Sequence, residues 1–288
     1  MRVVCMAYGS HSASAMRALW LVIIFTACTS NVPGDSDSSV GFGDQVDEGW
    51  TSVGYGVEYQ QQNAGSAFLI VYGGYQAEIS WSSAWATELV DVMLGSAGIG
   101  HVFGRVYAVQ GPEDPGYDAK EIGNSKLRAH LATIDDGVSP IIVVAHSSGV
   151  FVAHELLDQL YNAGQDDVLA RISYANLDGG GTGLTDDIVA SLGQITFAYA
   201  HDPTLDDGYS ENHDSAIELG ADYAPKATTF EVTVPNTGCD DGAGWCLHDV
   251  LITHRPHDPT YYDLADDYTD FDNRTPTTEY LDQFLSAK

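Results

Sequence analysis

One serine stands at the junction between a strand-like and a helix-like segment. Residues 140–145, PIIVVA, form a short apolar run typical of a buried strand, and residues 150–160, VFVAHELLDQL, have the spacing of an amphipathic helix. Only the residues HSSG, 146–149, connect the two segments. We therefore predict a sharp turn in which Ser147 projects from the edge of a sheet, next to the positive end of the following helix.

Small residues flank this turn on both sides. The string Ala145-His146-Ser147-Ser148-Gly149 follows the nucleophile-elbow pattern Gly-x-Ser-x-Gly, with alanine in the first place. Ser147 occupies the central position, so we predict it as the nucleophile in preference to Ser148. A serine hydroxyl is a weak nucleophile until a base removes its proton, so the motif also requires a histidine and a carboxylate that orients it.

An elbow of this type is followed along the chain by the acid and then by the histidine. Asp202 comes directly after the predicted strand 194–200, and His248 follows the predicted strand 228–235 after a short loop. The order and the placement of these residues predict a triad of Ser147, Asp202 and His248.

Two of these roles have competing candidates. Asp178 also comes just after a predicted strand, 171–177, and is the alternative acid. His254 and His257 are the alternative bases, although they lie farther from their strand. We expect the remaining candidates to take no part in proton transfer: His146 to pack beside the serine, His154 to lie on a helix surface, and Asp206 and Asp207 to be solvated loop residues.

Acyl transfer at a serine also needs donors for the oxygen that becomes negative in the tetrahedral intermediate. The amide of Ser148, directly after the nucleophile, is one predicted donor. The predicted strand 67–74 ends in Gly73-Gly74 and is followed by Tyr75, and glycines allow a loop to turn its amides inward. We predict the second donor from Gly74 or Tyr75.

Two cysteines lie next to the predicted base. Cys239 and Cys246 enclose the stretch CDDGAGWC, two residues before His248. A disulfide between them would suit an oxidising compartment and would brace the loop that carries the histidine. We therefore predict the bond Cys239–Cys246.

Apolar strand-like runs alternate with helical patterns from about residue 51 onward. Nearly continuous apolar strands between helices are typical of a parallel sheet that is covered on both faces. We predict an α/β domain over residues 51–288, with a mostly parallel central sheet and helices on both faces. The predicted strands are 52–60, 67–74, 105–110, 140–145, 171–177, 194–200 and 228–235, and the predicted helices are 83–94, 124–134, 150–163, 185–192, 215–223 and 278–287.

The first residues have the pattern of an export signal. Residues 1–27 contain a basic residue, an apolar run and small residues before Cys28, and Met16 is an alternative start. The string Phe-Thr-Ala-Cys is similar to a lipobox, in which the cysteine becomes lipidated. Residues 28–50 are rich in Ser, Gly and Asp and suit a flexible linker. We expect an exported protein, either a cell-envelope lipoprotein tethered through Cys28 or a secreted one.

The charge balance excludes several classes of partner. The chain has 11 Lys and Arg against 41 Asp and Glu, a formal net charge of −30, which argues against binding of nucleic acid or of an anionic lipid surface. The sequence has no GxxxxGK[ST], HExxH or paired CxxC motif. The acid-rich stretches 207–214 and 261–273 lack the regular spacing of a calcium loop. We expect no metal and no cofactor.

The elbow, the glycine loop, the triad order and the alternating strands resemble the α/β-hydrolase superfamily, and within it the exported bacterial esterases and lipases. The resemblance implies a serine hydrolase acting on small-molecule or lipid esters. Ser147 would attack the ester carbonyl, His248 would transfer the proton, and water would release the acyl group. Two alternatives stay open: a peptidase or amidase with the same triad, and a non-catalytic surface-binding lipoprotein with this fold.

Overall fold

The structure is a computed structural model that describes residues 49–54, 56–60, 66–96, 103–112, 123–240 and 244–252. Several predicted features lie outside these residues. They are the signal peptide with Met16, the lipidation site Cys28, the linker up to residue 48, the alternative bases His254 and His257, the acid-rich stretch 261–273 and the helix 278–287.

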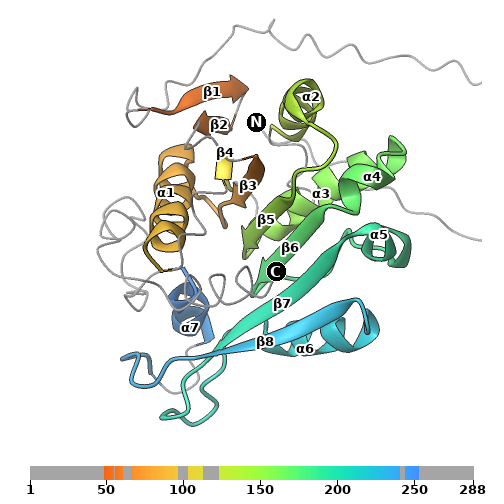
Figure 1. The fold of residues 1–288 in the computed structure, drawn as a ribbon. Coiled ribbons are helices and arrows are strands. Elements are labelled where there is room, and N and C mark those ends of the chain that lie inside the picture. Colours follow the sequence, from red (N-terminus) through yellow and green to blue (C-terminus); the bar gives the residue numbers. More distant parts are fainter. Residues whose placement is uncertain are drawn as a thin grey trace, which may run out of the picture. The chain divides into compact units, whose positions relative to one another are not determined.

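One eight-stranded sheet forms the centre of the fold, in the order β1-β2-β4-β3-β5-β6-β7-β8 (Figure 1). The neighbouring pairs β4-β3, β3-β5, β5-β6, β6-β7 and β7-β8 are parallel, whereas β2 is antiparallel to both β1 and β4. This mostly parallel sheet confirms the predicted α/β-hydrolase fold. The strands are β1 Thr51–Gly54, β2 Val57–Gln60, β3 Ala67–Tyr72, β4 Phe103–Val109, β5 Ile141–His146, β6 Ile172–Leu177, β7 Gln194–His201 and β8 Ala227–Thr233.

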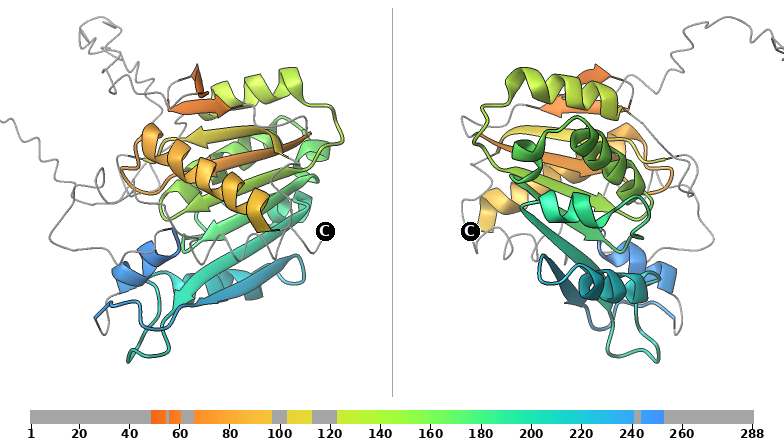
Figure 2. Two further views of the ribbon diagram at one scale, coloured as in Figure 1. Left: turned by 60° about the vertical axis from the view of Figure 1, so that its left-hand side comes forward. Right: turned by 90° about the vertical axis from the view of Figure 1, so that its right-hand side faces the viewer.

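Helices cover both faces of the sheet (Figure 2). Helices α1 and α7 lie on one face, and α2 to α6 lie on the other (Figure 1). The helices are α1 Ile79–Ser96, α2 Asn124–Ile134, α3 Gly149–Asn162, α4 Asp166–Leu169, α5 Asp186–Ser191, α6 His213–Asp222 and α7 Gly244–Val250.

Two separate apolar cores explain the uninterrupted apolar runs of the central strands. Alternate residues of β3 point to opposite faces. Leu69 and Val71 join the core under α1 and α7, while Phe68 and Ile70 join the core under α2 and α3. A strand that is buried on both faces therefore needs apolar side chains at every position.

One prediction about the strands is wrong. Residues 52–60 form two antiparallel strands, β1 and β2, in place of a single strand. Gly56, between them, has a φ of 70°, in the left-handed region that glycine adopts without strain. The chain reverses direction there, which a reading of apolar content alone does not detect.

The start of α3 packs directly on the loop that follows β3. A Cβ atom added to Gly149 would lie 2.2 Å from the carbonyl oxygen of Gly73. Only glycine at position 149 lets the helix begin this close to the neighbouring strand, so the sharp turn at Ser147 depends on it.

We predict that Gly149→Ala destabilises the protein by about 1–3 kcal/mol, because the added methyl group overpacks a backbone contact. This loss outweighs the gain of about 1 kcal/mol in helix propensity. Urea unfolding measures the difference. Gly180→Ala is the matched control, since a Cβ there would meet the Phe151 ring at an ordinary 3.5 Å. Equal stability of the two variants would contradict the packing argument.

Candidate active site

Ser147 lies in a strained turn at the carboxyl end of β5. Its φ is 54°, in the left-handed region that residues other than glycine rarely adopt. The amide of Ser147 donates to the carbonyl of Leu177, 3.1 Å away, which ties the turn to the end of β6. Ser147 is partly exposed, whereas His146 and Ser148 on either side are buried. The fold therefore leaves Ser147 partly accessible between two buried residues, and strained backbone of this kind is concentrated at functional sites.

The glycine loop after β3 lies against this serine. A Cβ atom on Gly74 would be 3.2 Å from the Cβ of Ser147. The loop is fixed on either side, because the amide of Gly73 donates to Val109 and that of Gln76 to Pro112. The amides of Gly74 and Tyr75 meet no acceptor within the described part of the chain. The structure thus brings the predicted second donor and the predicted nucleophile together.

A buried pair of side chains stands beside the elbow. Nδ1 of His248, on α7, donates to Oδ2 of Asp178 over 2.5 Å. His248 is 2% exposed and Asp178 is 0% exposed. The other ring nitrogen of His248, Nε2, is consequently the one that can accept a proton.

Asp178 is held by donors from the loop between β7 and α6. Ser210 Oγ donates to Oδ1 over 2.6 Å, and the amide of Asn212 donates to Oδ2 over 3.3 Å. The side chain of Asn212 also donates to the carbonyl oxygen of Asp178, 2.9 Å away. Asp178 itself has a φ of 48°, so its backbone is strained like that of Ser147.

These contacts set the charges of the pair. Burial raises the pKa of Asp178, but the hydrogen bonds from His248, Ser210 and Asn212 outweigh it, and the net pKa is lowered. Burial lowers the pKa of His248, but the bond to Asp178 and the charge of that carboxylate outweigh it, and the net pKa is raised. Asp178 therefore stays ionised, and His248 is a stronger base than an ordinary histidine.

His146 connects this pair to the elbow. Its Nε2 donates to the backbone carbonyl of His248 over 3.1 Å, and the two rings lie 4.4 Å apart. Burial and the neighbouring His248 lower the pKa of His146 to about 3. His146 is thus a neutral packing residue. Because it directly precedes Ser147, its contact with His248 holds α7 against the elbow.

Asp202 does not pair with His248, and the prediction that it orients the base is wrong in this geometry. Its carboxylate accepts from the amide and hydroxyl of Thr204, at 2.9 and 2.6 Å. It also accepts from the amide of Asn236 at 3.2 Å and from the amide and hydroxyl of Thr237, both at 2.8 Å. Five donors occupy this carboxylate, and the alternative acid, Asp178, is the one that meets the histidine.

Asp202 supports the position of His248 indirectly. It fixes the loop after β8, in which the amide of Cys239 donates to the Thr237 hydroxyl over 3.3 Å. Cys239 forms the predicted disulfide with Cys246, on α7, and their Cα atoms are 5.8 Å apart. His248 follows on the same helix. Asp202 and the disulfide thus form a chain of contacts that ends at His248.

The minor candidates fall into two groups. Asp206 and Asp207 are exposed loop residues. His154 is buried, contrary to the expected place on a helix surface. Its Nδ1 donates to the Thr182 carbonyl over 2.8 Å, and Tyr174 donates to its Nε2 over 2.9 Å. Burial lowers its pKa to about 4, so His154 is a neutral structural residue.

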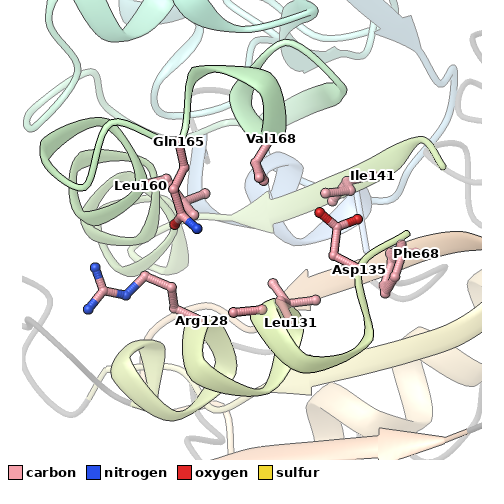
Figure 3. A pocket seen from close by; sticks show the side chains of 9 residues that line it. Phe68, Arg128, Leu131, Asp135, Ile141, Leu160, Gln165 and Val168 are labelled. Atoms are coloured by element: carbon pink, nitrogen blue, oxygen red, sulfur yellow. The ribbon is translucent and has the colours of Figure 1, made fainter. Parts of the chain in front are cut away.

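A small cavity lies at the opposite end of the strands (Figure 3). Phe68 and Ile141, at the beginnings of β3 and β5, line it together with the polar side chains of Arg128, Asp135 and Gln165. Its volume is about 20 Å³, which is room for a single water molecule. This cavity is too small for a substrate and is remote from Ser147.

Among the residues that the structure describes, no group of three or more His, Cys, Asp or Glu side chains could hold a metal ion. No helix in the same ranges is both long enough and apolar enough to cross a membrane.

Several solved structures are similar to the chain at low sequence identity. TT1662 from Thermus thermophilus is 14% identical, with a TM-score of 0.45, over 82% of this chain and 94% of that one. A predicted CIB-like hydrolase from Thermoplasma acidophilum is 14% identical, with a TM-score of 0.42, over 83% and 97%. ATU1826 from Agrobacterium tumefaciens, a protein of unknown function, is 14% identical, with a TM-score of 0.39, over 62% and 80%. No protein-family model and no curated protein matches the sequence.

We predict that Asp202→Asn lowers the free energy of unfolding by roughly 1.5–3 kcal/mol, because charged hydrogen bonds are lost and the new amide hydrogens face donors. Urea unfolding at pH 7 measures the loss. Asp207→Asn, at an exposed position of the same loop, is the control and should change stability by less than about 0.5 kcal/mol.

The stability lost in Asp202→Asn should depend on pH. Hydrogen bonds lower the pKa of Asp202 in the folded protein, against the effect of burial, which raises it. Its stabilisation is therefore complete above the unfolded pKa of about 4 and is lost as the pH falls below that value. The difference in free energy of unfolding between wild type and Asp202→Asn should become smaller below pH 4. A difference that does not change with pH would contradict the stabilising role of the ionised Asp202 carboxylate.

Proposed function

We propose that the protein is a serine hydrolase that cleaves carboxylic esters through Ser147, His248 and Asp178. One observation carries the proposal. The strained turn of Ser147 faces the Gly74 backbone on one side, and through His146 it contacts the helix of the buried Asp178–His248 pair on the other. A nucleophile, a base with an orienting acid, and oxyanion donors are the groups that acyl transfer needs.

The first half of the reaction forms an acyl-enzyme. Ser147 Oγ bonds to the ester carbonyl carbon while His248 Nε2 takes the hydroxyl proton. Asp178 stabilises the resulting imidazolium. The tetrahedral intermediate then collapses, the bond to the alcohol oxygen breaks, and His248 gives its proton to the leaving alcohol.

The second half regenerates the enzyme. Water bonds to the acyl carbon and gives a proton to His248, the bond to Ser147 Oγ breaks, and the serine regains its proton as the carboxylic acid leaves. In both halves the carbonyl oxygen becomes negative. The amide of Ser148 and an amide of Gly74 or Tyr75 are the proposed donors that stabilise this charge.

We predict that Ser147→Ala abolishes hydrolysis of p-nitrophenyl acetate by the full chain. Asp178→Asn should lower kcat by about 10⁴-fold, because the histidine loses its orientation and its counter-charge. Asp202→Asn should keep kcat within about tenfold of wild type, since its carboxylate does not contact the base. A loss in Asp202→Asn as large as in Asp178→Asn, with both variants folded, would assign the acid role to Asp202 instead.

A fluorophosphonate probe checks the nucleophile independently of the substrate. Wild type should be labelled at Ser147 and Ser147→Ala should not. An absence of labelling in the folded wild type would contradict the proposal. Comparison of p-nitrophenyl acetate with p-nitroacetanilide separates an esterase from an amidase, and faster cleavage of the anilide would overturn the ester assignment.

The pH profile gives a separate prediction. His248 acts as a base only when its imidazole is neutral, and the interaction with Asp178 raises its pKa above the ordinary value of about 6.5. The acid limb of kcat/KM should therefore have its midpoint above pH 6.5. In Asp178→Asn the residual activity should show a lower midpoint, and an unchanged midpoint would argue against this pair as the titrating group.

A further inference from the structure

One exposed aromatic ring stands directly beside the proposed base. Trp245 is 63% exposed, although the next residues of α7 are buried. Its ring lies 5.6 Å from the ring of His248, at 79° to it. Most of this indole is therefore free to contact a group that binds next to His248.

The residue Glu211, which carries a carboxylate, lies next to the start of α7. A Cβ atom on Gly244, the residue before Trp245, would lie 3.2 Å from the Cα of Glu211, so the two backbones are in contact. Glu211 is exposed, and its charge contributes to the raised pKa of His248. The backbone of Glu211 therefore lies beside the residue that precedes Trp245, and the charge of Glu211 acts on the proposed base.

The charges around the base are negative. Asp178, Asp249 and Glu211 all raise the pKa of His248, and the adjacent His146 is neutral. The lysines and arginines in the described ranges have no contact with Trp245, Glu211 or the Asp178–His248 pair. An anionic group would be repelled here, whereas a cation would be attracted.

The mechanism decides which part of the ester meets these residues. His248 passes its proton to the leaving alcohol, so the alcohol must lie on the His248 side of the reacting carbon. Trp245 is on that side. The alcohol portion of the ester is therefore the portion that contacts the indole and the carboxylate.

We propose that Trp245 and Glu211 form a subsite for a cationic alcohol group, so that the preferred substrates are esters of alkylammonium alcohols. This inference rests on the proposed esterase function. An indole face attracts an alkylammonium ion, and such contacts change affinity by roughly two- to thirtyfold. The nearby carboxylate of Glu211 adds to the attraction. The alkylammonium group can keep part of its hydration shell when it binds at this exposed position.

The test compares esters that differ in charge but not in shape. The full-length chain is assayed with choline acetate and with 3,3-dimethylbutyl acetate, in which carbon replaces the quaternary nitrogen. We expect kcat/KM to be about tenfold higher for the choline ester. An equal value, or a higher value for the neutral ester, would overturn the proposal.

Variants assign the preference to residues. Glu211→Gln should lower the choline-to-neutral ratio about five- to tenfold, and Trp245→Leu should lower it similarly, while Trp245→Phe keeps an aromatic face and retains part of it. The ratio removes any effect on steps that both esters share. Glu218→Gln, a matched change on exposed α6, should leave the ratio at the wild-type value. An unchanged ratio in Glu211→Gln and Trp245→Leu, with both folded by circular dichroism, would contradict the subsite.

The two proposals fail in different ways. If the neutral ester is hydrolysed and Ser147 is labelled, but the choline ester has no advantage, only the subsite is wrong. If neither ester is hydrolysed and Ser147 is not labelled, the proposed esterase function fails and the subsite fails with it.

Discussion

Asp178 is a carboxylate without access to water, and it keeps its charge only because donors surround it. Ser210 and Asn212 supply some of these donors, so the loop after β7 must fold back over the end of β6. His248 supplies another, so α7 must lie across the same strand ends. The disulfide, the Asp202 contacts and the His146 bond all serve to keep α7 there. The geometry of the site thus follows from satisfying one buried charge.

The sequence pattern placed two aspartates correctly at strand ends, but the prediction preferred Asp202 to Asp178, the one that contacts His248. Both follow a parallel strand, and the choice depends on which donors reach each carboxylate in three dimensions. Asp202 is followed two residues later by Thr204, and an aspartate that accepts from the residue two positions on is a local turn signal. Asp178 is followed by glycines and depends on donors more than 30 residues away. The local pattern therefore marks Asp202 as a structural residue, while the role of Asp178 depends on long-range contacts.

The fold was predictable where burial imposes a pattern. The apolar run of β5 and the amphipathic pattern of α3 fix the elbow between them, because a strand buried on both faces and a helix buried on one face constrain nearly every position. Helix α7 was not predicted. It has seven residues, too few for a periodic pattern, and it begins inside the disulfide loop. Its stability comes from tertiary contacts, which are not encoded in its own sequence. The roles of Ser210 and Asn212 were not predicted either, because these residues donate to Asp178, which is more than 30 residues away in the sequence.

The proposed preference for a cationic alcohol cannot be attributed to the net charge of −30. At physiological salt, exposed charges more than about 8 Å apart are largely screened, so most of the acidic surface contributes little at Ser147. Glu211 is different because it belongs to the loop that holds Asp178, one residue before Asn212. The segment that completes the proposed catalytic pair therefore also supplies the carboxylate of the proposed alcohol subsite. The proposed catalysis and the proposed selectivity for charge are thus coupled through this loop, so we expect a change that displaces residues 210–212 to alter both together.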